Sequence, residues 1–418
     1  MRIGMILPTQ FPPDIRVEKE IGSLAREHDI SLLCANNGTQ MQRETVRNVN
    51  VIRVLSRLRR GWANFELMTR CRSNIWRQEI EEFVREVSPD VLHVHDLPLL
   101  GTTCDVAEEY QVPVVADLHE NYPAMLEENR KIALHRVASM GRLVSRVAVS
   151  IPRWKEYEFE ALSRVERIVV VVEEARDRLV QNGISKDQID VVGNYEVQHS
   201  TKDQHAISES LPKGDGQFNV LYVGGFDATR DLHTVVSATA LMSRADYPDL
   251  RVWLVGGKGR YKKEIERQAA RLGLSDRISI LAWVSMDKVD QMISAADVGL
   301  VPHVKSPHTD STLPHKLFQY MWRQVPVITS NCRPLERIVN ETRCGLVYES
   351  GNAKDLAGCV AEIYMDKERS EEMARSGRRA VVGKYNWQNA GAVLQQMYHQ
   401  MQIRLCVDEA RMGEQVVR

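Results

Sequence analysis

Lys316 and its neighbours are the first candidates for chemistry in this sequence. The stretch 310–328 reads DSTLPHKLFQYMWRQVPVI, which predicts a polar Ser/Thr-rich loop, a helix opened by Pro314 and a short buried strand at 325–328. Because a helix N-terminus carries unpaired amides and a partial positive charge, Lys316 in the first turn would complete a phosphate-binding site. The alternative is a lysine on an ordinary amphipathic helix, and this stretch alone does not separate the two.

Two glycine-rich turns point to the same ligand. GGFDATRDL places Gly224 and Gly225 at the end of a predicted strand and Arg230 six residues after the first glycine, and VGGKGR repeats the pattern with Gly256 and Lys258. Such turns suit a nucleoside diphosphate, since each charged hydrogen bond contributes roughly 1.5 to 3 kcal/mol. Glycines that serve only the backbone of the turn are the alternative.

The first turn of the chain is different. Its sequence, PTQFPPDIRVEKE, lacks the glycine fingerprint with which dinucleotide-binding proteins approach a pyrophosphate. This absence disfavours an NAD-dependent enzyme.

His93 and His95 stand two residues apart in a predicted strand and therefore share one of its faces. This spacing permits metal coordination. Because no clear third and fourth ligand accompanies the pair, we expect no metal here and interpret HVHD as the end of a buried strand.

Several polar residues of the first half lie at predicted strand ends. These are Arg16, Asp96, His119 and Glu120. Because the ligands of a parallel sheet bind at the carboxyl ends of its strands, the four residues are candidate site residues. For His119, a structural histidine with satisfied hydrogen bonds is the alternative.

The elements that must position these residues are short runs rich in β-branched residues, separated by helix-length amphipathic segments. The runs lie at 2–8, 28–34, 49–55, 90–96, 113–119, 167–172 and 189–194, and then at 218–225, 251–257, 277–284, 297–303, 325–330 and 344–350. This alternation predicts an α/β fold with parallel sheets covered by helices on both faces.

A polar stretch divides the two sets of runs. Residues 196–217, EVQHSTKDQHAISESLPKGDGQ, have the texture of a linker. We therefore expect two Rossmann-like domains, at 1–195 and 218–384, with a cleft between them. A C-terminal crossover helix and tail should occupy 385–418.

The composition excludes several classes of protein. With 43% hydrophobic and 27% charged residues the chain has a globular composition, and its formal net charge of -1 does not favour nucleic acid. The 7 cysteines are scattered without a CxxC pair, so we expect reduced thiols in a cytoplasmic protein. No apolar run approaches the roughly 20 residues that cross a bilayer, so any membrane contact should be peripheral.

Residues 130–155 are unusually basic, with Arg and Lys but no Asp or Glu. An amphipathic helix of this charge would hold the protein against anionic lipid on the inner face of the membrane, at about 1 kcal/mol per cation. We favour this interpretation; an ordinary basic surface helix is the alternative.

The chain resembles the retaining nucleotide-sugar glycosyltransferases of family 4 (glycosyl transferases group 1), which have the two-domain GT-B architecture. The matching stretches occur in order through nearly the whole chain. They are FPPDIRVEKEIGSLA, DVLHVHDLPLL, VVADLHENYP, RIVVVVEEARDRL, VVGNYE, NVLYVGGFDATRDLHTVVSA, VWLVGGKGR, ISILAWVSMDKVDQMISAADVGLVPH, LPHKLFQYMWRQVPVI and RIVNETRCGLVYESGNAKDLA.

The resemblance assigns roles by position. It implies that Arg230 and Lys316 contact the donor diphosphate and that His119 lies by the transferred sugar. Gln319 falls where the family has a glutamate that binds the nucleotide ribose. Apart from the resemblance, we expect the loop amides of Thr312 and Leu313 and a base pocket near Val284 on the donor side. From their places at strand ends we expect Arg16, Asp96 and Glu120 on the acceptor side.

Four positions depart from the family pattern. Gln319 and Ser311 stand where the family has its paired acids, Gly225 replaces an arginine of many members, and Gln324 replaces a glycine. An amide still bonds a hydroxyl but lacks the charge of the acid.

The resemblance implies a retaining hexosyltransferase that requires neither metal nor cofactor. Its co-substrate would be a nucleoside-diphosphate sugar, and its acceptor a glycan or lipid-linked glycan of a cell-surface polysaccharide or glycoconjugate. Because the paired acids are missing, the alternative is a catalytically silent member that binds nucleotide or glycan and partners another transferase.

Overall fold

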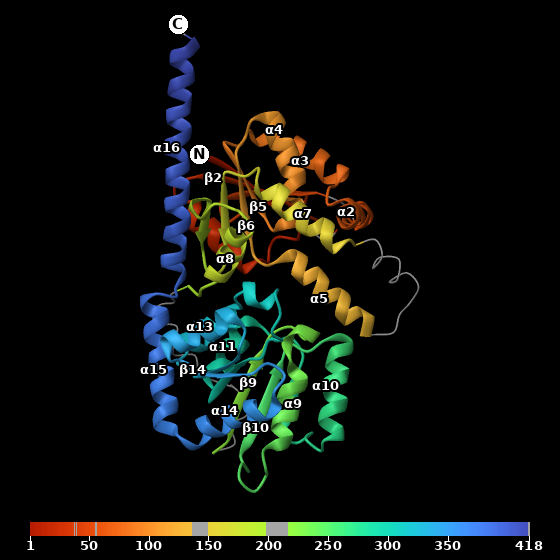
Figure 1. Ribbon diagram of the computed structural model, residues 1–418, viewed down its shortest axis with the longest axis vertical. Helices are drawn as coiled ribbons and strands as arrows, with labels where there is room; N and C mark the ends of the chain where they lie inside the picture. Colours follow the sequence, from red (N-terminus) through yellow and green to blue (C-terminus); the bar gives the residue numbers. More distant parts are fainter. Residues whose placement is uncertain (37, 39, 55–56, 136–148, 198–215, 417–418) are drawn as a thin grey trace. The chain divides into compact units, whose positions relative to one another are not determined.

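The computed structural model describes residues 1–416 except 37, 39, 55–56, 136–148 and 198–215. Contacts divide the chain into two compact units (Figure 1). Unit 1 comprises Met1–Gly193 and Asn389–Arg418, and unit 2 comprises Asn194–Gln388. Most of the predicted linker, 196–217, lies outside the described residues.

Unit 1 is built on a sheet in the order β3-β4-β2-β1-β5-β6-β7-β8. Its strands are β1 (Arg2–Leu7), β2 (Asp29–Ala35), β3 (Arg43–Val46), β4 (Val49–Val54), β5 (Val91–His95), β6 (Val114–Leu118), β7 (Arg167–Val170) and β8 (Ile189–Val191). All pairs are parallel except β3 with β4. β3 was not predicted, because its sequence, RETV, is short and alternates between exposed and half-buried residues without an apolar run.

The helices of unit 1 follow the expected alternation with strands. They are α1 (Ile15–Leu24), α2 (Arg57–Arg70), α3 (Asn74–Val87), α4 (Leu100–Tyr110), α5 (Tyr122–His135), α7 (Ile151–Leu162) and α8 (Glu173–Gln181), with short 3-10 turns η1 (Leu97–Leu99) and η2 (Lys186–Gln188). The predicted basic helix at 130–155 falls on the end of α5 and the start of α7, and 136–148 lie outside the described residues.

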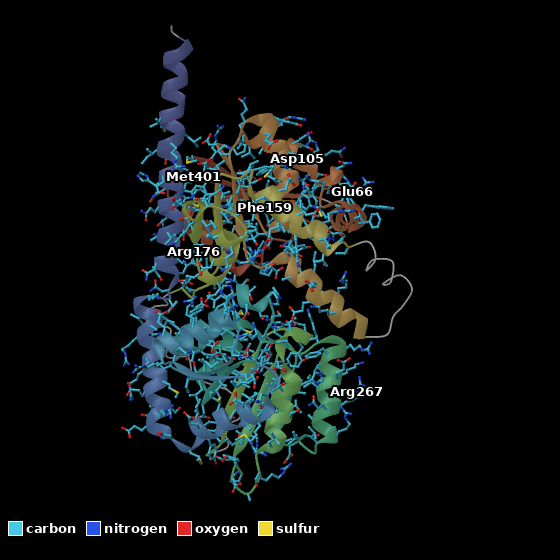
Figure 2. The ribbon with its side chains drawn as sticks, in the orientation of Figure 1. Glu66, Asp105, Phe159, Arg176, Arg267 and Met401 are labelled. Carbon is cyan, nitrogen blue, oxygen red and sulfur yellow. The ribbon has the colours of Figure 1, made fainter. Side chains whose placement is uncertain are left out.

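The last helix, α16 (Trp387–Val416), begins in unit 2 and continues in unit 1. Within unit 1 it buries Leu394, Tyr398 and Met401, the last of which is labelled in Figure 2. The Gln395 side chain also donates a hydrogen bond to the Ser23 carbonyl at 2.9 Å. The part of α16 between Ala390 and Met401 therefore contributes buried side chains to unit 1.

Unit 2 contains a parallel sheet in the order β11-β10-β9-β12-β13-β14. Its strands are β9 (Phe218–Val223), β10 (Leu250–Val255), β11 (Ile278–Leu281), β12 (Val298–Val301), β13 (Val327–Ser330) and β14 (Gly345–Tyr348). β9 lies between β10 and β12, so the turns that follow these three strands leave the sheet at one edge. This edge carries most of the predicted donor residues.

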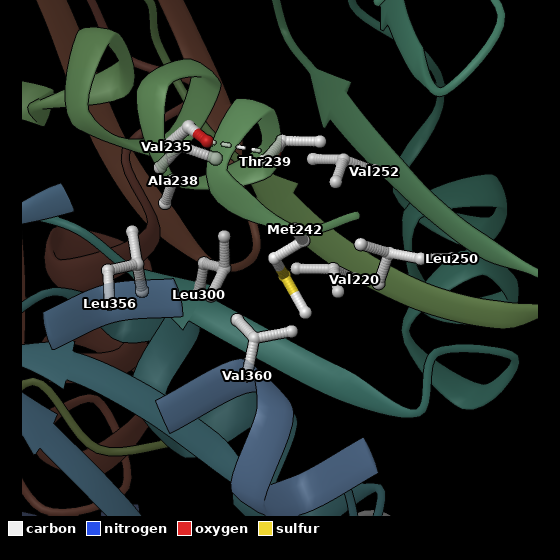
Figure 3. Close-up of a pocket in the computed structure, with 10 residues that line it drawn as sticks. All are labelled: Val220, Val235, Ala238, Thr239, Met242, Leu250, Val252, Leu300, Leu356 and Val360. Atoms are coloured by element: carbon white, nitrogen blue, oxygen red, sulfur yellow. Dashed lines mark hydrogen bonds between the residues drawn. The ribbon is translucent and has the colours of Figure 1, made fainter. Parts of the chain in front are cut away.

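The helices of unit 2 are α9 (Leu232–Leu241), α10 (Gly259–Arg271), α11 (Met286–Ser294), α12 (His315–Trp322), α13 (Arg333–Thr342), α14 (Ala353–Met365) and α15 (Lys367–Gly383), with 3-10 turns η4 (Ala228–Arg230) and η5 (Thr309–Ser311). α9 packs against both α10 and α14 (Figure 1). Under α9 lies a cavity of about 10 Å³ lined by residues such as Val220, Met242 and Val360 (Figure 3). A space of one water molecule with apolar walls is a packing gap and not a substrate site.

No helix in the described part of the chain combines the length and the apolar character needed to cross a membrane. Both sheets confirm the predicted α/β class with parallel strands.

Candidate functional site

Lys316 is the second residue of α12, whose N-cap is Pro314, and so lies in the first turn as predicted. Its Nζ is 4.1 Å from the centroid of the Tyr222 ring on β9. No ion pair of Lys316 with a carboxylate is found among the described residues. Burial, and then the charge of Arg230, lower the pKa of Lys316 well below its usual value. A partly buried ammonium group without an acid partner is suited to an anionic ligand.

Tyr320 places α12 against the end of β9. Its hydroxyl donates a hydrogen bond to the Leu221 carbonyl at 3.1 Å and accepts one from the Val223 amide at 3.2 Å. A Cβ on Gly299 of β12 would lie 2.5 Å from the Tyr320 ring, so glycine at this position lets the helix approach the sheet. These contacts hold the N-terminal turn of α12 beside the turn after β9.

The two predicted glycine turns touch each other. Gly224 and Gly256 have φ values of 149° and 106°, in the region that favours glycine. A Cβ on Gly256 would lie 2.3 Å from the Gly224 carbonyl oxygen, and a Cβ on Gly224 would lie 2.6 Å from Lys316 Nζ. Both glycines are therefore required by close approach, whereas Gly225 faces open space.

Arg230, at the end of η4, is held by His303, the second residue after β12. Arg230 Nη1 donates a hydrogen bond to His303 Nε2 at 2.8 Å, and Arg230 Nε lies 3.3 Å from Asp227 Oδ2. His303 is 2% exposed. Burial, followed by the charges of Arg230 and Lys316, lowers the pKa of His303 well below its usual value, so the ring is a neutral acceptor. The sequence analysis missed this role, although His303 ends a predicted strand.

The other predicted donor residues differ in their exposure to solvent. Lys258 is exposed at the start of α10, and Val284 is half-buried beyond β11. Thr312 and Gln319 are half-buried on either side of Lys316 in the sequence. Leu313 is buried, and its carbonyl accepts a hydrogen bond from the Asn194 side chain at 3.2 Å. The structure thus brings Gly224, Gly256, Arg230 and Lys316 together.

Asp310 does not replace the acid that the family places at Ser311. Its Oδ1 accepts a hydrogen bond from the Arg333 amide at 2.8 Å, at the start of α13. Ser311 is buried, and its hydroxyl donates to the Pro307 carbonyl at 3.1 Å. Asp310 is therefore a helix-capping residue.

In unit 1 the prediction for Arg16 needs correction. Arg16 is 3% exposed, and its guanidinium lies 2.6 Å from Asp117 Oδ1 and 2.9 Å from Glu20 Oε1. It also donates to the Val192 carbonyl at 2.9 Å. A guanidinium so engaged in the interior stabilises the fold and does not face an acceptor.

His119 has a carboxylate near each ring nitrogen. Nε2 lies 2.7 Å from Asp117 Oδ2, and Nδ1 lies 3.4 Å from Asp96 Oδ2. Asp96 also accepts the His119 amide at 3.1 Å. Burial disfavours the charged ring, but Asp96 and Asp117 outweigh it and raise the pKa of His119 to about 10. The ring is therefore a fixed imidazolium. The third candidate of this region, Glu120, is half-buried.

Two family models match the chain. The model described as glycosyl transferases group 1 matches residues 203–380, and the glycosyl transferase 4-like domain matches residues 16–195. Together they span most of both units. The chain belongs to the group 1 glycosyl transferases.

Curated relatives in this group are distant. Alpha-D-kanosaminyltransferase of Streptomyces kanamyceticus is 21% identical over 299 residues, which cover 69% of this chain and 71% of the relative. Phosphatidyl-myo-inositol mannosyltransferase of Mycolicibacterium smegmatis is 21% identical over 412 residues, covering 95% of this chain and 93% of the relative. The match to the lipopolysaccharide core glycosyltransferase LpsE of Rhizobium meliloti spans 45% of that protein.

Solved structures share the two-domain GT-B fold with this chain. Sucrose-phosphate synthase from Thermosynechococcus elongatus superimposes with a TM-score of 0.74 at 17% identity, covering 97% of this chain and all 100% of that one. The Anabaena protein HepE in complex with UDP gives a TM-score of 0.66 at 15% identity, covering 96% and 100%. The GT-B architecture predicted from the sequence is confirmed.

Proposed function

We propose that this glycosyl transferase moves a sugar from a nucleoside-diphosphate sugar to a glycan or lipid-linked acceptor, with retention of the anomeric configuration, in the synthesis of a cell-surface polysaccharide or glycoconjugate. One observation carries the proposal: the Lys316 ammonium lies against Gly224 and near Arg230 without a carboxylate partner among the described residues. Two cations at the glycine turn fit a diphosphate.

The chemistry of this group is electrostatic. As the glycosidic bond breaks, negative charge develops on the leaving diphosphate, and Lys316 and Arg230 stabilise it from fixed positions. The hydrogen bond from Arg230 to His303 fixes the guanidinium without adding a competing anion. Since these cations supply the charge, we propose that transfer needs no metal at the donor site.

His119 enters this proposal as a fixed cation and not as a proton carrier. With Asp117 and Asp96 beside its two ring nitrogens, neither nitrogen is available to accept a proton from an acceptor hydroxyl. This supports a retaining reaction in which the departing phosphate acts as the base. The configuration of the product, read from its anomeric NMR coupling, tests retention; an inverted anomer would contradict it.

Named relatives suggest the ligands to test. HepE is described in complexes with UDP and with UDP and glucose, and phosphatidyl-myo-inositol mannosyltransferase names a lipid acceptor. We propose measuring the thermal shift of the protein with UDP, GDP, CDP, ADP and dTDP, and repeating it on Lys316→Ala. A nucleotide at about 100 times its dissociation constant adds about 2.7 kcal/mol of stability. One nucleotide that stabilises the wild type but not the variant would support the donor site.

We further propose that the protein works in the cytoplasm, on the inner face of the membrane. Helix α2 carries two exposed aromatic side chains and contacts the predicted membrane surface at 130–155 through Arg153. Trp62 and Phe65 are 66% and 55% exposed. Their ring centroids are 6.1 Å apart, and the Arg153 side chain of α7 contacts the Thr69 carbonyl at the end of the same helix. Aromatic side chains beside cations suit a lipid interface.

Vesicle sedimentation tests this surface. We expect binding to vesicles that contain phosphatidylglycerol, weaker binding to pure phosphatidylcholine, and a loss of binding in the double variant Trp62→Ser, Phe65→Ser. The exposed Phe159 of α7 provides a control, Phe159→Ser, which should bind normally. Equal binding of the double variant and the wild type would argue against α2.

The silent family member remains the second candidate, because Gln319 and Ser311 replace the paired acids. It predicts a folded protein that binds nucleotide or a partner transferase without transfer or hydrolysis of any nucleotide sugar. Release of free nucleotide that depends on an acceptor would exclude it.

A further inference from the structure

Four ionisable side chains meet in the interior of unit 1. His93 and His95 project from one face of β5, and their ring centroids are 4.7 Å apart. Glu20 of α1 and Asp117 of β6 lie against them, and all four side chains are 0% exposed. The third and fourth ligands that the sequence did not reveal next to HVHD are therefore present, from segments far apart in the chain.

The distances among the four facing atoms are those of a small coordination shell. His93 Nε2 lies 3.5 Å from Glu20 Oε2 and 3.9 Å from Asp117 Oδ2. His95 Nδ1 lies 4.0 Å from the same glutamate oxygen and 3.1 Å from the same aspartate oxygen. Tetrahedral zinc with bonds of 2.0 to 2.2 Å separates its nitrogen and oxygen ligands by about 3.3 to 3.6 Å. One cation at the centre could reach every atom after small side-chain shifts.

Two of these atoms have no hydrogen-bond partner within the described structure. They are His93 Nε2 and Glu20 Oε2, both fully buried. A buried polar atom left unpaired is costly, and the Arg16 guanidinium that pairs with both acids brings one positive charge to two carboxylates. Each of the four residues offers one ligand atom, and these atoms all lie within 4.8 Å of one another.

The surrounding contacts orient the ligands in the way that metal sites require. Tyr398 Oη lies 2.7 Å from His93 Nδ1, which leaves Nε2 to face inward. Arg16 holds the outer oxygens, Asp117 Oδ1 and Glu20 Oε1. Such outer contacts fix the ring orientation and the carboxylates of a metal site. Asp117 Oδ2 is shared with His119 and with Arg16 Nε, at 2.7 and 3.0 Å, so it would be the weakest of the four ligands.

We propose that Glu20, His93, His95 and Asp117 bind one divalent transition-metal cation, with zinc as the best fit. Imidazole nitrogens combined with carboxylate oxygens are typical of zinc sites, and four protein ligands without an open position make the site structural. The site shares Asp117 with His119 but includes no residue of the donor group of unit 2, so metal analysis tests it without a transferase assay.

The competing occupant is a proton on Glu20. Burial and the neighbouring Asp117 raise the pKa of Glu20 well above its usual value, so a neutral carboxylic acid would also relieve the repulsion between the two acids. A proton can be donated to one neighbour, whereas a cation engages all four atoms. Metal analysis separates the two.

The experiment uses the full chain without an affinity tag, purified without metal-chelate chromatography. Elemental analysis should find about one zinc per chain in the wild type. Glu20→Gln and His93→Gln keep the size of the side chain and should lose the metal. His28→Gln is the matched control, because the His28 ring also lies near Tyr398, at 5.6 Å between ring centroids, but is not one of the proposed ligands. This variant should keep the metal.

Cobalt substitution keeps the test decisive if the variants do not fold. Wild-type protein stripped with a chelator and given Co²⁺ should develop the visible absorption of four-coordinate cobalt, which added Zn²⁺ should abolish. Wild-type protein that contains no metal as purified and takes up neither ion would overturn the proposal in favour of the proton. Retention of full metal content in Glu20→Gln and His93→Gln would overturn it as well.

Discussion

Arg230 Nη1 donates a hydrogen bond to His303 Nε2 at 2.8 Å. The acceptor is a neutral, buried imidazole, so this contact orients the guanidinium without adding a second anion to Asp227, which already lies 3.3 Å from Arg230 Nε. An aspartate in the same position would orient Arg230 equally well but would compete with a phosphate for it. His303 is thus a positioning residue for the proposed donor site.

Replacement of His303 should therefore affect affinity according to the acceptor that remains. We expect His303→Leu to weaken nucleoside-diphosphate binding about tenfold, the equivalent of about 1.4 kcal/mol, because Arg230 loses its anchor. His303→Gln retains an acceptor oxygen and should bind more tightly than His303→Leu. Calorimetric titration of both variants measures this, and equal affinities would show that the hydrogen bond does not position Arg230.

Lys316→Met separates function from stability. Removing the ammonium deletes a transition-state contact, so turnover should fall by about tenfold or more. The same change removes a partly buried charge that has no acid partner, so the melting temperature should be unchanged or higher. Lys354→Met, on the exposed face of α14, is the control for turnover. A variant with normal turnover would rule out Lys316 as a donor-site residue.

Nucleotide affinity should fall as the pH rises. In the free protein the pKa of Lys316 is lowered by burial and by Arg230, and a bound diphosphate would raise it again. When the pH lies above the pKa that Lys316 has in the free protein, nucleotide binding must be accompanied by uptake of a proton. The affinity for the nucleotide therefore falls progressively toward alkaline pH.

Titrations from pH 7.5 upward avoid the last ionisation of the nucleotide itself, near about 6. Calorimetry in buffers of different ionisation enthalpy should detect proton uptake by the wild type. In Lys316→Met the uptake should disappear. Uptake of the same size in this variant would assign it to another group.

Much of the donor site follows from the order of the sequence. Gly224 and Gly256 each fall at the end of an apolar run, and parallel strands deliver such residues to one edge of a sheet. Lys316 opens the helix that Pro314 predicts. The contact between the two glycines explains why both turns carry the same residue type. The positions of these donor-site residues can therefore be predicted from hydrophobic periodicity and turn residues alone.

Other contacts depend on side chains that meet from distant segments. Arg16 pairs with Asp117 across 101 residues, and a local pattern does not reveal whether an arginine after a strand points outward or into the core. The sequence around Glu20, which lies on the same helix as Arg16, likewise does not reveal that its carboxylate is buried beside His93.

Gln324 illustrates a third case. The glycine that the family has at this position favours a left-handed backbone conformation. Gln324 adopts the same conformation, with φ 55°. The fold has kept the left-handed turn after α12 while the residue type that favours it has changed. A departure from the family pattern at this position therefore bears on local strain and leaves the donor site intact.

The neighbouring glycines of the first turn provide the sharpest paired test. Gly224 has φ 149°, and an added Cβ would lie 2.6 Å from Lys316 Nζ, so Gly224→Ala should displace the ammonium and weaken nucleoside-diphosphate binding at least tenfold. It should also lower the free energy of unfolding by about 1 kcal/mol, because alanine disfavours this φ. A Cβ on Gly225 meets no atom within 4 Å, so Gly225→Ala should bind and unfold like the wild type. Binding constants and urea midpoints of the two variants decide the matter: if both behave alike, the glycine turn does not shape the position of Lys316.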